Sequence, residues 1–194
     1  MDIQCQPRFA PGRCDRISAA GDRQCADLAD APDLAVAIHA LRHSLLWAVP
    51  GTYALLITLN RSRNICIGRR GRFRFPAGFY LYIGSALGPG GLGGRVERHL
   101  CAEKRLHWHV DYLLHATETR ITQVWAKEGA AHRECDWARA AMQLPGASIV
   151  LPHFGSSDCR CAAHLIGFAS PAKLPSLHAF AALVGDPVRQ WMTR

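Results

Sequence analysis

The chain has 194 residues, 49% of them hydrophobic, which suits one domain with a buried core or at most two small units. No apolar run reaches the roughly 18 residues of a membrane span, and the N-terminus lacks a basic start followed by an apolar stretch, so we expect no membrane segment, no secretory signal and a cytoplasmic protein. The net charge is +8, and in a protein without a signal the eight cysteines are expected to be thiols or metal ligands, not disulfides.

The positive charge is unevenly distributed along the chain. Residues 1–33 hold six Asp and four Arg, a net charge of −2, so the rest of the chain must carry +10. Twenty of the 23 basic residues are arginines, whose planar guanidinium binds phosphate through two hydrogen bonds. A GC-rich genome would also enrich arginine, but it would not cluster the charge. A basic body favours a polyanionic partner, and DNA is the one we expect.

The chain begins with a segment that has no apolar periodicity, and we interpret residues 1–33 as a flexible arm. A helix follows, because Leu34, Ile38, Leu41 and Leu45 fall on one helical face. Residues 52–59 then predict a strand whose Tyr53, Leu55, Ile57 and Leu59 share one side.

An arginine-rich hairpin is predicted next. Residues 64–68 are strand-like, and after a turn Phe73 and Phe75 alternate with Arg72 and Arg74, so that one side is apolar and the other basic. The arginines expected to contact nucleic acid are Arg61, Arg63, Arg69, Arg70, Arg72 and Arg74, together with Arg98 farther along. They would bind the phosphate backbone without reading sequence, although a solvated hairpin surface would have the same composition.

The rest of the chain predicts a strand over 78–84, a glycine-rich loop to residue 94, a helix to about 106, and a short helix near Asp111. A strand over 121–126, a helix over 131–142, a short strand over 148–151 and a helix over 176–192 with a break near residues 185–187 follow. This order predicts an α+β fold with helices flanking a small, mostly antiparallel sheet, an inserted basic hairpin and a C-terminal helix. The expected units are the arm (1–33), a central domain (34–168) and a helical extension (169–194).

Two tripeptides, Gly51-Thr52-Tyr53 and Tyr82-Ile83-Gly84, flank the predicted strands and are followed by Arg95-x-x-x-His99. Taken singly, strand tyrosines are usually half-buried aromatics, and a helical Arg or His usually faces solvent. Four residues apart, however, Arg95 and His99 share a helical face. Arg95 could stabilise a phosphoryl group, and His99 could take or give a proton near neutral pH. Together these side chains suit phosphodiester cleavage.

With these motifs the chain resembles the GIY-YIG nuclease superfamily, although Thr52 stands where isoleucine is usual. Three further runs resemble one branch of it, domain of unknown function 123, which is sometimes fused to endonuclease III: residues 107–114, Glu134-Cys135, and residues 154–165. The resemblance implies that Tyr53 positions or deprotonates a water molecule and that Tyr82 supports it or binds phosphate. It also implies that Glu134 binds one Mg²⁺ or Mn²⁺ ion, with Asp111 as the reserve ligand.

A second group of residues, Cys159-x-Cys161-x-x-His164, has ligands that zinc prefers. Cys135 or His153 could complete a tetrahedron. The spacing is not a common zinc-finger spacing, and a turn with buried thiols is the competing interpretation, which we prefer. Zn²⁺ is therefore the less favoured cofactor.

The sequence thus predicts a metal-dependent endonuclease acting on DNA, with a role in repair and a repair glycosylase or another repair protein as a partner. Two alternatives stay open: a nucleic-acid-binding module that does not cut, and a protein whose working or structural site is the Cys/His group, as zinc or as a thiol nucleophile. The first two differ in whether Glu134 and Tyr53 converge near Arg95. The third requires Cys159, Cys161 and His164 to meet at one point.

Overall fold

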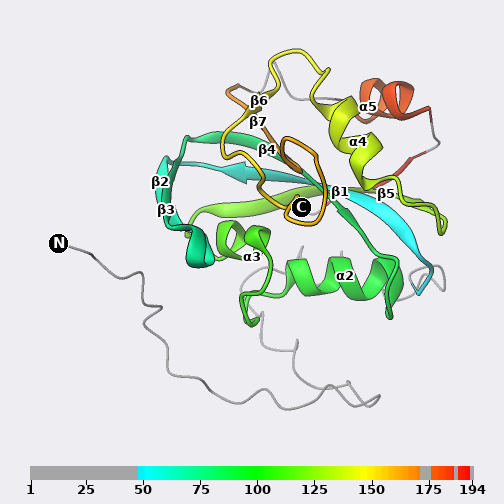
Figure 1. The fold of residues 1–194 in the computed structure, drawn as a ribbon, viewed down its shortest axis with the longest axis horizontal. Helices are drawn as coiled ribbons and strands as arrows, with labels where there is room; N and C mark the ends of the chain where they lie inside the picture. The colour runs from blue at the N-terminus through cyan, green and yellow to red at the C-terminus, as the bar shows by residue number, and fades with distance from the viewer. Residues whose placement is uncertain (1–47, 171–175, 186–187, 193–194) are drawn as a thin grey trace.

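The fold is built on a mostly antiparallel sheet with helices on both faces, as the sequence predicts (Figure 1). The computed structural model describes residues 48–170, 176–185 and 188–192. The arm expected over 1–33 and the helix expected to follow it lie outside the described residues.

The main sheet has six strands in the order β6-β7-β4-β1-β5-β8, and each neighbouring pair is antiparallel. In chain order the strands are β1 (Gly51–Leu59), β4 (Gly78–Ser85), β5 (Thr119–Glu128), β6 (Ser148–Ile149), β7 (Leu165–Phe168) and β8 (Arg189–Met192). The central strand β1 is buried on both faces, so its sequence is almost continuously apolar.

Two hydrophobic cores lie on opposite faces of this sheet. On one face, Leu55 and Ile57 of β1 pack in a core with residues of α2 (Gly91–Leu100) and α3 (His109–Leu114). On the other face, Ala54 and Leu56 pack in a second core with Trp137 and Phe180, which come from α4 (Glu134–Ala141) and α5 (Leu177–Val184). Figure 1 shows α2 and α3 on one side of the strands and α4 and α5 on the other.

The arginine-rich hairpin forms a separate two-stranded sheet of β2 (Arg63–Cys66) and β3 (Arg72–Phe75), joined through a short 3₁₀ turn, η1 (Gly68–Arg70). Ile65 and Phe75 are buried, whereas Arg72 and Arg74 are exposed, as the alternating pattern predicts. The Arg70 guanidinium donates a hydrogen bond to the Pro152 carbonyl (2.8 Å), which ties the hairpin to the loop after β6.

The glycine-rich helix differs from its predicted bounds. It was expected to begin at residue 94 and continue to about 106, but α2 begins at Gly91 and ends at Leu100. Gly91 has φ +55°, and a Cβ there would lie 2.4 Å from the Val49 carbonyl oxygen, so only glycine fits at this turn. Glycines that discourage a helix in sequence patterns here allow its first turn to pack against the chain before β1.

The C-terminal segment ends its helix near the predicted break, but the residues described beyond that break do not become helical again. Gly185 adopts a left-handed conformation (φ 66°), and its N–H bonds to the Ala181 carbonyl, which closes α5. Residues 189–192 then form β8, which pairs with β5. Strand β7, over residues 165–168, was not predicted either, because its four residues are too few to show a period and Gly167 interrupts them.

The cysteines and the absence of a membrane span are two further expectations that can be compared with the structure. Cys101, Cys135, Cys159 and Cys161 are thiols, but Cys66 is disulfide-bonded, which departs from the expectation of thiols throughout. Within residues 48–170, 176–185 and 188–192, no helix is long and apolar enough to cross a membrane.

Candidate functional site

The two tripeptides meet on adjacent strands, because β1 and β4 pair with Tyr53 opposite Gly84 and Leu55 opposite Tyr82. Tyr53 and Tyr82 therefore lie diagonally on one face, with ring centroids 6.5 Å apart. A Cβ on Gly84 would lie 2.4 Å from the Tyr53 hydroxyl. The glycine of the second tripeptide thus leaves room for the tyrosine of the first.

Both tyrosines line an open cleft of about 460 Å³ together with Arg95 of α2 and Glu134 of α4. The predicted catalytic and metal-binding residues therefore converge, although they come from four different elements. The cleft is also lined by Gly84, Ser85, His107, Trp108, His109, Gly155, Ser157 and Asp158.

His99 lies behind the cleft wall and not on it. Its side chain is 1% exposed, and its Nε2 is 2.7 Å from the Tyr53 hydroxyl. Its Nδ1 is 3.9 Å from Asp111 Oδ1, and neither of these two buried atoms has a hydrogen-bond partner. A shift of under about 1 Å would join them, giving a line of polar groups from Asp111 through His99 to Tyr53.

Burial sets the protonation of this line. It lowers the pKa of His99 well below its usual value, and the nearby Lys104, Arg95 and Arg98 cations lower it further. Burial also raises the pKa of Tyr53 well above its usual value, with Tyr82 adding to the rise and the Arg95 cation opposing it. At neutral pH His99 is therefore neutral, and the Tyr53 hydroxyl can donate its hydrogen bond to Nε2.

Asp111, the reserve metal ligand of the sequence prediction, has a structural position. It is fully buried, and its Oδ2 accepts hydrogen bonds from the Arg98 guanidinium and the backbone N–H groups of His107 and Trp108, each at 2.9 Å. It caps the start of α3 and holds Arg98 in place. It does not line the cleft, so a metal ion in the cleft would need ligands other than Asp111.

Arg95 and Arg98 both lie against the aromatic ring of Trp108. Their guanidinium carbons lie 4.3 Å and 4.5 Å from the centroid of the Trp108 ring. Cation–π contacts of this kind orient a guanidinium at little cost in hydration. Trp108 therefore positions Arg95 in the cleft and Arg98 on the Asp111 carboxylate.

Glu134 contacts both the cleft and the Cys/His group predicted from the sequence. It lines the cleft, and its Oε1 is 3.0 Å from Nδ1 of His164. The exposed Asp158 adds a second carboxylate to the cleft. The sequence prediction treated Asp158 only as turn material, because a Ser-Asp pair before a cysteine has no distinctive spacing.

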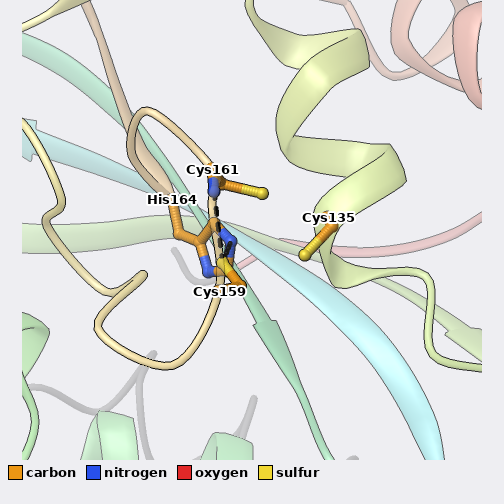
Figure 2. Close-up of side chains that lie close together, drawn as sticks. All are labelled: Cys135, Cys159, Cys161 and His164. Carbon is orange, nitrogen blue, oxygen red and sulfur yellow. Dashed lines mark hydrogen bonds between the residues drawn. The ribbon is translucent and has the colours of Figure 1, made fainter.

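The predicted Cys/His group does come together, and Cys135 supplies its fourth member. The ligand atoms of Cys135, Cys159, Cys161 and His164 all lie within 4.8 Å of one another. Figure 2 shows Cys135, at the start of α4, facing the loop that carries the other three residues. Our preference for a simple turn with buried thiols is therefore the weaker interpretation of this segment.

Of the predicted nucleic-acid-binding arginines, Arg98 is held by Asp111, and the six others divide into two groups. Arg61 and Arg63 lie near Glu118, with N–O distances of 3.7 Å and 3.3 Å. Arg69, Arg70, Arg72 and Arg74 are exposed on the hairpin. Arg70 is also close enough to the cleft residue His109 to help burial lower the pKa of that histidine. The hairpin thus continues the positive charge of the cleft.

Several cleft residues were not assigned a role from the sequence. Trp108 was quoted only within a longer run, and the roles of His107 and His109 were left open. His109 Nδ1 accepts a hydrogen bond from the Gly155 N–H (3.1 Å), and a Cβ on Gly155, whose φ is +76°, would lie 3.1 Å from the Tyr82 ring. The signal that could have identified them is their position in the sequence. His107, Trp108 and His109 follow the helix that carries Arg95, and Gly155 precedes the Cys/His group.

Comparison with known proteins gives one result. A family model described as "Domain of unknown function DUF123" matches residues 52–183, which include Tyr53, the second tripeptide, helix α2 with Arg95 and all four members of the Cys/His group. No curated protein and no solved structure matches the chain.

Proposed function

We propose that this chain, which belongs to the DUF123 family of domains of unknown function, is a metal-dependent endonuclease of the GIY-YIG type that hydrolyses phosphodiester bonds in DNA. One observation supports this proposal above all: Tyr53, Tyr82, Arg95 and Glu134, taken from separate elements, line a single polar cleft. Such a cleft combines a proton acceptor, a fixed cation and a carboxylate around one point.

The first task of such an enzyme is to activate water. Tyr53 is 2% exposed, and its hydroxyl donates a hydrogen bond to Nε2 of the neutral His99. The same Nε2 atom can accept the Tyr53 proton. As the water attacks phosphorus, its proton would pass to the Tyr53 oxygen while the Tyr53 proton passes to His99. The Asp111 carboxylate would then stabilise the imidazolium that forms, in the way that a buried aspartate orients and stabilises a catalytic histidine.

The second task is to stabilise the charge of the transition state. Arg95 lies in the cleft on the ring of Trp108 and can donate two parallel hydrogen bonds to phosphoryl oxygens. His107 and His109 on the same wall offer further N–H donors. These groups are fixed before substrate arrives, so little reorganisation is needed during the reaction.

A divalent ion fits the chemistry of the remaining side chains. Glu134 and Asp158 provide carboxylate oxygens in the cleft, and one Glu134 oxygen remains available beside the bond to His164. Hard oxygen ligands of this kind suit Mg²⁺ or Mn²⁺. When bound, the ion would neutralise phosphoryl charge and help the leaving oxygen to depart.

The hairpin supports DNA as the substrate. Its exposed arginines lie on a segment that Arg70 connects to the loop lining the cleft, so a bound backbone could run from one to the other. We place the activity in DNA repair in the cytoplasm, with a repair glycosylase or another repair protein as partner, because chains that this one resembles are sometimes fused to endonuclease III.

The test is a cleavage assay with branched, nicked and single-stranded DNA in the presence of Mg²⁺, Mn²⁺ or a chelator. Wild-type protein should cut at least one substrate with metal and none with chelator. Arg95→Ala should lose about 3 kcal/mol of transition-state stabilisation, which corresponds to a rate at least roughly a hundredfold lower. Arg139→Ala, an exposed arginine on α4, is the matched control and should cut normally. If the wild type cuts nothing with any metal, or Arg95→Ala cuts at the wild-type rate, the proposal fails.

A second candidate function is a binding module that does not cut. Tyr53 and His99 are both buried, so the Tyr53 hydroxyl could contact a water molecule only at the cleft wall. This restricted access to water favours a domain that binds without cutting. DNA binding without cleavage in the same assay would select this function.

A further inference from the structure

We propose that Cys135, Cys159, Cys161 and His164 form a structural zinc centre, and that this centre fixes the position of Glu134 in the cleft. The first part concerns metal binding alone and stands without any catalytic activity. The second part gains its importance from the proposed function, since Glu134 is the carboxylate of that site.

The geometry of the four ligands suits zinc. Their ligand atoms lie within 4.8 Å of one another, and Cys159 Sγ is 3.4 Å from His164 Nε2. A tetrahedral site with usual Zn–S and Zn–N bonds has sulfur-to-nitrogen edges of about 3.6 Å. Small side-chain rotations would therefore complete the tetrahedron without movement of the backbone.

The ligand types select the metal. Three thiol sulfurs and one imidazole nitrogen are soft and intermediate ligands, which favour zinc and disfavour Mg²⁺ or Mn²⁺. Four such ligands gathered around one point therefore suit a structural metal centre.

The histidine connects the cluster to the cleft. His164 is 1% exposed, and its two nitrogens face different partners: Nε2 lies toward Cys159, and Nδ1 is 3.0 Å from Glu134 Oε1. If Nε2 binds zinc, Nδ1 must carry the proton and donate a hydrogen bond to the Glu134 carboxylate. This is the arrangement in which a carboxylate orients a metal-binding imidazole, and here the carboxylate is held in return.

The covalent chain reinforces this connection. Cys135 is the next residue after Glu134, so the metal would fix the first turn of α4 from which the carboxylate extends. The loop between Phe154 and His164 provides three ligands and also the cleft residues Gly155, Ser157 and Asp158. Figure 2 shows this loop beside the start of α4, with Cys135 directed toward it. Zinc would thus hold together the two segments that form one wall of the cleft.

The metal is tested first, on the full chain and without DNA. Elemental analysis of the purified protein should find one zinc per chain, and Co²⁺ replacing it should show the visible and thiolate charge-transfer absorption of a tetrahedral sulfur site. Cys159→Ser should lose both signals, whereas Cys101→Ser, which changes a thiol outside the cluster, should keep both. Stoichiometric iron, or a wild-type protein that binds neither zinc nor cobalt, would overturn the zinc centre even if the serine variant does not fold.

The link to Glu134 is tested by zinc affinity in a chelator competition. Glu134→Gln should weaken zinc binding by about 10- to 100-fold, as for other carboxylates that support a metal-binding histidine. Glu103→Gln, an exposed carboxylate of the same kind, should leave it unchanged. Equal affinities for Glu134→Gln and the wild type would overturn the link. A protein that binds zinc as expected but cuts no DNA would disprove only the nuclease proposal, so the two failures are distinguishable.

Discussion

His99 is the residue on which the chemistry of the proposed mechanism depends most. It contacts the Tyr53 hydroxyl through Nε2, faces Asp111 through Nδ1, and packs 5.7 Å from the Trp108 ring. Because its surroundings are buried and rich in cations, it stays neutral where an exposed histidine would begin to be protonated. The same shift that makes it a proton acceptor also makes it a determinant of stability.

The free energy of unfolding should therefore depend on pH through His99. Its pKa is lowered in the folded state, so below pH 6.5, the usual value, the unfolded chain binds a proton that the folded chain refuses. Its contribution is complete above that pH and is lost as pH falls, with a slope of at most about 1.4 kcal/mol per pH unit. Urea unfolding of the wild type and of His99→Gln at pH 7.5 and 5.5 should show the smaller loss in the variant.

The comparison with the variant is needed because other histidines also titrate. Burial lowers the pKa of His109, which acts in the same direction as His99. Burial acts to lower the pKa of His164, but the Glu134 carboxylate and Cys159 together raise it above its usual value, and this acts in the other direction. If both proteins lose the same free energy between the two pH values, His99 is not the group responsible.

At the scale of the elements, the pairing of β1 with β4 determines the site. Tyr53 faces Gly84 across the two strands, and a one-residue slip in register would turn the tyrosine to the other face of the sheet. The apolar run of β1 and the second tripeptide were visible in the sequence, so the two tyrosines could be placed on adjacent strands in advance.

Gly84→Ala tests this pairing directly. The added methyl group would meet the Tyr53 hydroxyl at 2.4 Å, and the phenol cannot move away without breaking its bond to His99. We expect cleavage to fall by at least tenfold, while the melting temperature falls by only a few degrees, because the conflict is confined to one side-chain tip. Gly88→Ala is the matched control, since a Cβ there has nothing within 4 Å. Equal activities of the two variants would show that the Tyr53 position does not matter.

Other elements could not be placed from the sequence, for identifiable reasons. Strand β7 has four residues buried on both faces, so it shows no alternation, and β8 follows a helix whose pattern would continue but for Gly185. Trp108 gives no sign in the sequence that two guanidinium groups lie against it. The sequence offered Cys135 and His153 as the fourth member of the Cys/His group, and Cys135 takes this place because α4 begins beside the loop before β7. These are tertiary contacts, and local pattern does not encode them.

At the scale of the whole molecule, positive charge is the feature that most constrains the partner. The exposed arginines lie on the hairpin, and the half-buried Arg95 and Arg98 lie on α2. Arg70 donates a hydrogen bond to the loop that leads into the cleft, so the two groups are connected. A long polyanion could contact both, whereas a small anion could not.

DNA binding should therefore weaken steeply as salt rises, because each neutralised phosphate releases counterions. Reversing the charge of Arg70, Arg72 and Arg74 to glutamate should reduce affinity for all sequences alike and make the salt dependence shallower. Fluorescence titrations at several salt concentrations measure both effects. Arg139→Glu, on the exposed part of α4, should change neither by much. Unchanged affinity in the triple variant would remove the hairpin from the interface.

The stacking of Trp108 has a practical consequence for observing this protein. Its indole stands in the cleft wall against Arg95 and Arg98, so a polyanion that draws these cations toward itself would change the electric field at the ring. Trp125 and Trp137 are enclosed in the core on the opposite face of the sheet and would give a steady background. The molecule thus contains its own optical probe of the cleft, and occupancy can be followed by intrinsic emission without an attached label.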